Sequence, residues 1–179
     1  MVIQEMTEQE CRAMLARADI ARLACARNNQ PYIAPIHVDL DGEFLYGYAT
    51  LGQKIEWMRQ NPLVCLEIDE VITSWQWASV VVFGDYEELP HTPEYEDARG
   101  VAERLFEKHP TWWEPASVPL AGHEQRTRIV FRIRIGRVTG RRAAPDTVNT
   151  VHVRGNASAA KRPRWLAQIL RRVARYAPE

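Results

Sequence analysis

Residues 46–54 read Tyr-Gly-Tyr-Ala-Thr-Leu-Gly-Gln-Lys. The segment is predicted to be a β-strand that runs into a turn at Gly52, with Lys54 opening a helix. Free amides and the dipole at a helix start favour an anion, a glycine lets the backbone approach closely, and a lysine adds positive charge. Tyr48, Thr50 and Lys54 are therefore candidate ligands of a phosphate group. The competing interpretation is an ordinary helix start with a solvated lysine.

The composition is typical of one soluble domain. Of 179 residues, 46% are hydrophobic, and 23 Lys and Arg balance 23 Asp and Glu. A chain without net charge has no global field to recruit nucleic acid or an anionic membrane. No apolar run reaches the roughly 18 residues of a membrane span, and the N-terminus is acidic where a signal peptide would be basic. Cys11, Cys25 and Cys65 lack CxxC spacing and are expected to be reduced and buried, which predicts a cytoplasmic protein.

Short β-rich segments dominate the first 140 residues. Asp41-Gly42 is a strong hairpin signal, and Pro35, which cannot donate to a ladder, places its strand at a sheet edge or a bulge. Helices do not alternate regularly with strands, so the sequence predicts a mainly β fold, an antiparallel barrel with helical decorations. Six β segments are expected, at residues 20–27, 32–39, 44–49, 63–71, 79–88 and from 129 onward. Three helices are expected in the same region, at residues 7–18, 52–60 and 93–108. The first begins with a capping box from Thr7 to Glu10, and the last is capped by Thr92. Residues 72–78 are expected to form a loop with two tryptophans.

Several motifs follow one another in a characteristic order. They are Pro-Tyr-Ile-Ala-Pro-Ile-His-Val at 31–38, Asp41-Gly42, the segment 46–54, Asn-Pro-Leu-Val-Cys-Leu-Glu at 61–67, Trp-Ala-Ser-Val-Val-Val-Phe-Gly at 77–84 and Phe-Arg-Ile-Arg-Ile-Gly-Arg-Val-Thr-Gly at 131–140. This ordered set resembles the pyridoxamine 5'-phosphate oxidase-like split-barrel family, and within it the nitroimidazole-resistance-type flavoproteins. The resemblance spans most of the chain before residue 140.

The resemblance implies a homodimer of six-stranded split barrels with FMN in two clefts at the subunit interface. Matching positions assign Ala34, Pro35, Ile36 and His37 to the flanks of the flavin ring, and Tyr48, Ala49 and Thr50 to the ribityl chain. Lys54 would bind the phosphate, and Trp77 and Ser79 would help to close the cleft. Pyridoxamine-phosphate oxidases carry further arginines around the phosphate, whereas Gln53 precedes Lys54 here, so oxidation of vitamin B6 is not expected.

His37 is open to three interpretations. It is the candidate catalytic residue of a flavin reductase, where an imidazole can donate a hydrogen bond to developing negative charge. The same resemblance includes barrels in which a histidine binds haem iron. The third interpretation is a strand histidine held by a backbone carbonyl. The other histidines lack metal-ligand spacing, so no metal site is expected.

Residues 141–179 form a C-terminal extension beyond the split-barrel domain of residues 1–140. Within it, residues 161–176 combine arginines with an apolar stripe, which predicts an amphipathic helix docked on the barrel or on a second subunit rather than on nucleic acid. Trp75 and Trp77 are candidates for the cleft wall or for dimer packing.

The leading functional hypothesis is an FMN-dependent oxidoreductase that reduces a small planar acceptor, nitroaromatic or quinone-like. A deazaflavin is an alternative cofactor. The alternative functions are a haem-binding protein that uses His37, and a flavin-binding or ligand-binding module without turnover.

Overall fold

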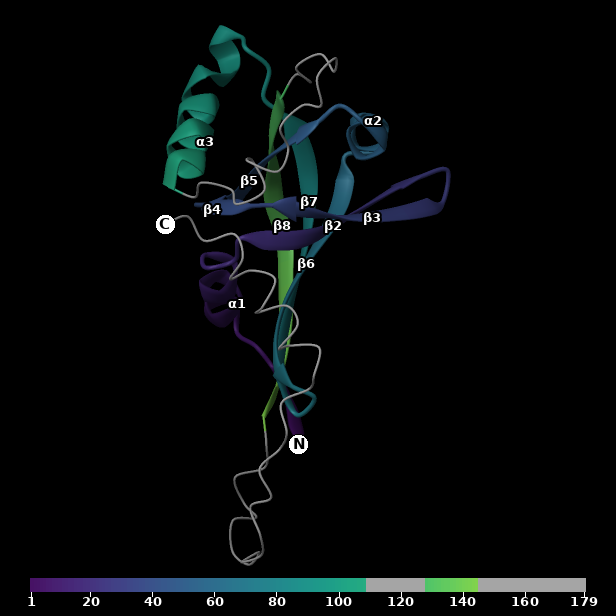
Figure 1. Ribbon diagram of the computed structural model, residues 1–179, viewed down its shortest axis with the longest axis vertical. Coiled ribbons are helices and arrows are strands. Elements are labelled where there is room, and N and C mark those ends of the chain that lie inside the picture. The colour runs from purple at the N-terminus through teal and green to yellow at the C-terminus, as the bar shows by residue number, and fades with distance from the viewer. Residues whose placement is uncertain (109–127, 145–179) are drawn as a thin grey trace, which may run out of the picture. The chain divides into compact units, whose positions relative to one another are not determined.

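The computed structural model describes residues 1–108 and 128–144, and these form one antiparallel sheet with helices (Figure 1). The strand order is β3-β2-β6-β7-β8-β5-β4, and β1 pairs with β8. The strands are β1 Val2–Glu5, β2 Ile20–Arg27, β3 Gln30–His37, β4 Asp39–Asp41, β5 Phe44–Thr50, β6 Leu63–Thr73, β7 Gln76–Glu88 and β8 Arg128–Ala144. The helices are α1 Glu8–Leu15, α2 Gln53–Gln60, the 3-10 turn η1 Pro93–Tyr95 and α3 Glu96–Lys108.

The predicted fold class is confirmed, but the described part of the chain has eight strands rather than six. The two extra strands are short: β1 has four residues and β4 has three. All four β1 residues are exposed, so their sequence shows no alternation of buried and exposed positions. They form a strand because they pair with the far end of β8, where Glu5 lies opposite Arg141. Because the pairing between β1 and β8 joins residues far apart in the sequence, it produces no local sequence pattern from which β1 could be predicted.

Two tight turns set the first hairpins, and the second of them is the predicted turn at Asp41-Gly42. Asn28 and Asn29 both have positive φ, 50° and 61°, which is the conformation of a two-residue hairpin turn. Gly42 has φ 56° in the β4–β5 turn. β3 is an end strand of the sheet, where Pro35 needs no ladder partner on its outer side.

The core lies on the inner face of the sheet and under α1. Its largest fully buried side chains include Phe131 and Ile133 of β8, Leu45 of β5 and Leu66 of β6. α1 begins with the predicted capping box, since the Glu10 amide donates to the Thr7 hydroxyl and the Thr7 amide to the Glu10 carboxylate. Cys11 and Cys25 are buried as expected, Cys65 is half-buried, and all three are free thiols.

α3 covers the outer face of β5 and β8, where a second apolar cluster forms around Tyr46, Val130 and Ala102. This helix was predicted, and Thr92 is the N-cap as expected, with Pro93 in the first turn. The cap belongs to the 3-10 turn η1 that leads into α3, and the Thr92 side chain makes no capping hydrogen bond. The loop prediction at residues 72–78 was also wrong, since β6 extends to Thr73 and β7 begins at Gln76. β-branched and aromatic residues there continue the hairpin to a tight turn.

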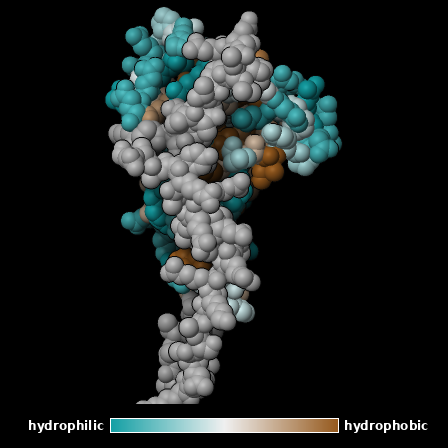
Figure 2. All heavy atoms as spheres, in the orientation of Figure 1, coloured by the Kyte–Doolittle hydropathy of each residue, from teal (hydrophilic) through white to brown (hydrophobic). Residues whose placement is uncertain are grey.

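Figure 2 shows hydrophilic residues over α3 and over the side that carries α2, with hydrophobic residues visible mainly between them. No helix within residues 1–108 or 128–144 is long and apolar enough to cross a membrane. The predicted helix at 161–176 and most of the predicted C-terminal extension lie outside the described residues.

Candidate functional site

The start of α2 combines several anion-binding features. Thr50, the last residue of β5, is exposed, and Gly52 is the N-cap of α2. Because Gly52 has no side chain, it supplies no capping hydrogen bond to the first-turn amides of the helix. Lys54 lies in that first turn, half-buried, and its ammonium makes no ion pair with the described residues. This geometry leaves backbone donors, a hydroxyl and a positive charge at one corner.

The charge of Lys54 acts on the pKa of the Cys25 thiol in β2. Burial raises the pKa of the Cys25 thiol, and the positive charge of Lys54 opposes that rise. Lys54 is therefore close enough to the β2 strand for its charge to act at the end of the barrel, where α2 contacts β2.

β3 brings Ala34, Pro35 and Ile36 to the same end of the molecule. Ile36 is buried, Ala34 is half-buried and Pro35 is exposed, as the alternation of a strand requires. Tyr32 on the inner side packs edge-on against Trp57 of α2, with ring centroids 5.8 Å apart. This contact ties β3 to the helix that carries Lys54.

His37 is 5% exposed and both of its ring nitrogens have partners. Nδ1 lies 2.8 Å from the backbone carbonyl of Asp19, and Nε2 lies 2.7 Å from a carboxylate oxygen of Asp39. Both partners are acceptors, so both bonds form fully when the ring carries two protons. Burial by itself lowers the pKa of His37, but the Asp39 carboxylate and the Asp19 carbonyl outweigh it and raise that pKa overall. The arrangement favours a buried imidazolium-carboxylate pair.

Tyr48 lies on the outer face of β5, beneath α3. Its ring meets the Phe106 ring edge-on at 5.0 Å, and the Arg128 guanidinium carbon lies 3.4 Å from the Tyr48 ring centroid. Ala49, one residue on, points to the opposite face and is buried in the core. Gly47 is required here, because a Cβ at that position would come within 3.0 Å of the His37 carbonyl and of the Phe131 ring.

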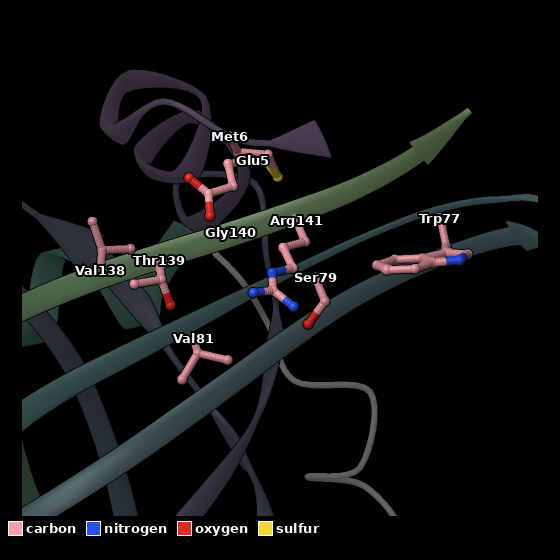
Figure 3. Close-up of a pocket in the computed structure, with 9 residues that line it drawn as sticks. All are labelled: Glu5, Met6, Trp77, Ser79, Val81, Val138, Thr139, Gly140 and Arg141. Carbon is pink, nitrogen blue, oxygen red and sulfur yellow. The ribbon is translucent and has the colours of Figure 1, made fainter. Parts of the chain in front are cut away.

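Trp77 and Ser79 lie elsewhere, in an open cleft between β1, β7 and β8 (Figure 3). Ser79 is opposite Arg141 on β8, whereas Thr50 is opposite Arg128 near the other end of the same strand. The stretch of β8 between these two arginines spans roughly 40 Å at about 3.3 Å per residue. β3, which carries Ala34, Pro35, Ile36 and His37, contacts β5, which carries Tyr48, Ala49 and Thr50 and leads into the start of α2 with Lys54. Trp77 and Ser79 lie at a distance from these residues within one chain.

Four residues of these two regions were not predicted: Asp39, Phe106, Arg128 and Arg141. Asp39 had a local signal, because residues i and i+2 of an extended segment share a face with His37. The other three had none. Arg128 and Phe106 reach Tyr48 from β8 and α3, and Arg141 joins Ser79 through strand pairing, all over long sequence separations.

Comparison with known proteins identifies the family. Residues 7–142 match the family described as pyridoxamine 5'-phosphate oxidase. An uncharacterised protein of Rhizobium meliloti is 44% identical over 146 residues, which are 80% of this chain and 97% of that protein. The crystal structure of a FAD-binding protein from Mesorhizobium loti is 38% identical with a TM-score of 0.69, over 80% of this chain and all of that one.

A Bacteroides thetaiotaomicron structure, provisionally described as a 5-nitroimidazole antibiotic resistance protein, shares the fold. It has 17% identity and a TM-score of 0.56, over 79% of this chain and 89% of that one. The match to the family spans most of the chain and includes every described strand from β2 to β7. The resemblance read from the motifs is confirmed: the chain belongs to the pyridoxamine 5'-phosphate oxidase family of split-barrel proteins.

Proposed function

We propose that this protein is a flavin-dependent oxidoreductase that reduces a small planar acceptor, and that the start of α2 holds the phosphate of the flavin. The observation that carries the proposal is the uncapped N-terminus of α2 with Thr50 and Lys54 beside it. Three kinds of donor lie within five residues of the chain there: backbone amides, a hydroxyl and an ammonium. A phosphate is the common biological group that uses all three.

The cofactor is FMN in the simplest form of the proposal. FAD contains the same riboflavin phosphate, so the α2 corner serves both, and the 38% identical Mesorhizobium loti protein is described as FAD-binding. A bound flavin supplies the redox chemistry, and the protein sets its position and electrostatics. In this proposal Ala34, Pro35 and Ile36 flank the flavin ring, and Tyr48 and Ala49 lie along the ribityl chain.

His37 has a supporting role in this proposal. It is nearly fully buried, and its imidazole joins Asp19 to Asp39 just where β3 passes into β4. It fixes the end of the strand that would flank the flavin, and it keeps a positive charge beneath that end. A haem-binding function would require Nε2 to leave Asp39 or Nδ1 to leave Asp19, and the geometry therefore favours the flavin.

We propose further that the active form is a homodimer in which each cleft takes residues from both chains. Two observations support this. Trp77 and Ser79 lie roughly 40 Å along β8 from the Thr50 end, too far for one flavin to reach both. The outer face of the sheet also exposes a row of apolar side chains that includes Ile33, Leu63 and Phe83, at 62%, 66% and 40%. A second copy would bury this face and bring the two regions together.

The spectrum of the purified protein tests the cofactor. We expect a yellow protein that releases stoichiometric FMN or FAD on denaturation. Lys54→Ala should weaken flavin affinity by about tenfold or more, because it removes a charge-assisted hydrogen bond worth about 1.5–3 kcal/mol. Lys54→Arg should keep most of the affinity, and Arg104→Ala, which removes an exposed charge on α3, should leave it unchanged.

A colourless protein that binds neither added FMN nor added FAD would contradict the proposal. Flavin binding without any reduction of nitroaromatic or quinone acceptors by NAD(P)H would instead support the module without turnover. Flavin fluorescence quenching measures the affinity, and stopped-flow absorbance measures the reduction.

A further inference from the structure

The cleft between β1, β7 and β8 has features of a binding site in its own right. It has a volume of about 640 Å³ and is open on one side. Val81, Val138 and Met6 provide apolar surface, and Trp77 provides a flat indole at one end. Flat aromatic surface beside polar groups is a common arrangement for a planar ligand.

Arg141 differs from the other arginines of β8 in the described part of the chain. Arg132, Arg134 and Arg142 pair with carboxylates, and Arg128 and Arg137 stack on aromatic rings. The Arg141 guanidinium has no ion pair and no ring contact with the described residues. It lies between the Thr139 and Ser79 side chains in the view of Figure 3. A guanidinium fork with no carboxylate partner, inside a cleft, is suited to an anion.

The two hydroxyl groups beside Arg141 have different roles. The Ser79 hydroxyl donates its hydrogen to Glu67 at 2.9 Å, so it can only accept a further hydrogen bond. The Thr139 hydroxyl makes no hydrogen bond with the described residues and can donate to an anion. Arg141 and Thr139 lie two residues apart on one strand, and therefore on the same face of the sheet.

Glu5 is the one carboxylate that lines the cleft with Arg141 in the described structure. It is paired with Arg141 in the strand register, but the two side chains form no salt bridge there. In Figure 3 the Glu5 carboxylate and the Arg141 guanidinium lie on opposite sides of the β8 ribbon in this view. Glu5 therefore weakens the attraction for an anion without neutralising Arg141 directly.

We propose that this cleft binds a planar ring that carries a phosphate group, with the ring against Trp77 and the phosphate at Arg141 and Thr139. The proposal builds on the proposed flavin function and names a second phosphate subsite, separate from the α2 corner. The ligand has two possible sources with the same chemistry: the adenylate half of a bound FAD, or a free nucleotide. The two phosphates of FAD are directly bonded to each other, so the first source requires the proposed dimer, in which the α2 corner of the partner lies beside this cleft. The flavin phosphate then stays at Lys54 of the partner subunit, and only the adenylate phosphate reaches Arg141.

The first experiment uses AMP and adenosine as probes, by isothermal titration of the protein as purified and after exchange of its flavin to FMN. AMP should bind about tenfold or more tightly than adenosine, because the phosphate gains a charge-assisted hydrogen bond. Arg141→Ala should abolish this difference, and Arg141→Lys should keep part of it. Glu5→Gln should increase AMP affinity a few-fold, and Arg104→Ala should change nothing.

The second experiment separates the two sources by comparing FAD with FMN. If Arg141→Ala weakens FAD about tenfold and leaves FMN unchanged, the cleft holds the adenylate half of the cofactor. If it weakens AMP alone, the ligand is a free nucleotide. Equal binding of AMP and adenosine, or AMP affinity that Arg141→Ala leaves intact, would overturn the proposal. Circular dichroism confirms the fold of each variant. Failure of both FMN and FAD to bind the wild type would contradict the proposed flavin function. The comparison of AMP with adenosine would still test whether this cleft binds a phosphate.

Discussion

His37 connects two segments that are adjacent in space but not in sequence. Its ring bridges the Asp19 carbonyl, which precedes β2, and the Asp39 carboxylate in β4. The backbone adds a parallel link, since the Val38 amide donates to the same Asp19 carbonyl at 3.3 Å. A buried ion pair of this kind fixes a conformation while both members are charged, and it becomes a source of instability when one loses its charge.

The raised pKa of His37 predicts how stability depends on pH. A group whose pKa is higher in the folded state stabilises the fold below its ordinary value, about 6.5, and loses that contribution as pH rises through the folded-state value. The wild type should therefore lose stability above about pH 6.5 relative to His37→Gln. Urea unfolding across that range measures both. His91→Gln, at an exposed histidine, should follow the wild-type curve. A gap between wild type and His37→Gln that stays constant with pH would refute the role of the pair.

Among the candidate site residues, the sequence predicted those that lie together in a local motif and missed those that meet only through the pairing of distant strands. Thr50 and Lys54 were predicted because five residues of chain hold the strand end, the glycine and the lysine together. His37 was predicted, but its charge state depends on Asp19, which is 18 residues away. Arg141 needs the register of β7, β8 and β1 before it joins Trp77 and Ser79.

Among the elements, β8 has the most complex set of partners. Its first part, from Arg128 to Arg134, pairs with β5, and its last part, from Arg141 to Ala144, pairs with β1. Between these parts the register with β7 shifts, since Phe83 is opposite Arg137 and Gly84 is opposite Ile135. The extra residue is a β-bulge, and bulges bend a strand and increase its twist. The bulge therefore marks the point where β8 changes partners.

Gly84 allows this bulge, and its replacement should destabilise the fold. A Cβ on Gly84 would lie 2.5 Å from the Arg134 carbonyl oxygen and 2.7 Å from an Ile133 methyl group. Gly84→Ala should lower the free energy of unfolding by about 1–3 kcal/mol, the usual cost of overpacking. Gly100→Ala is the matched control inside α3, where the nearest atom is the mobile end of Arg104 at 3.4 Å. It should stabilise the fold by about 0.5–1 kcal/mol.

Chemical denaturation of both variants measures these changes in the free energy of unfolding. A Gly84→Ala variant as stable as the wild type would show that the backbone of β8 yields at the bulge. The sequence predicted β8 from its alternating Ile and Phe, and the bulge has a local signal that the prediction did not use: the Ile and Phe positions are odd-numbered up to Ile135, and the next apolar position, Val138, is even-numbered, with Gly136 between them. The change of partners has no such signal, because it depends on strands that are distant in sequence.

At the scale of the whole molecule, the separation of two predicted site regions is the central fact. The ordered set of motifs placed Lys54 and Trp77 in one flavin cleft. The β8 register shows instead that, within one chain, the β5 end that leads to Lys54 and the β7 end that carries Trp77 lie near opposite ends of β8. Sequence patterns describe one chain and contain no information on which residues meet across a two-fold axis. A symmetric dimer would pair the Lys54 end of one protomer with the Trp77 cleft of its partner, twice.

Complementation between subunits tests this arrangement directly. Lys54→Ala and Trp77→Ala homodimers should each bind flavin weakly, because each lacks one residue in both clefts. Co-expressed with different tags and purified through both, the mixed dimer contains one cleft with neither change and one with both. We expect it to bind flavin at wild-type affinity with half the wild-type stoichiometry. Light scattering should show a dimer, and a doubly tagged Lys54→Ala pair should show no rescue. Mixed dimers that bind no better than their parents would place each cleft within a single chain.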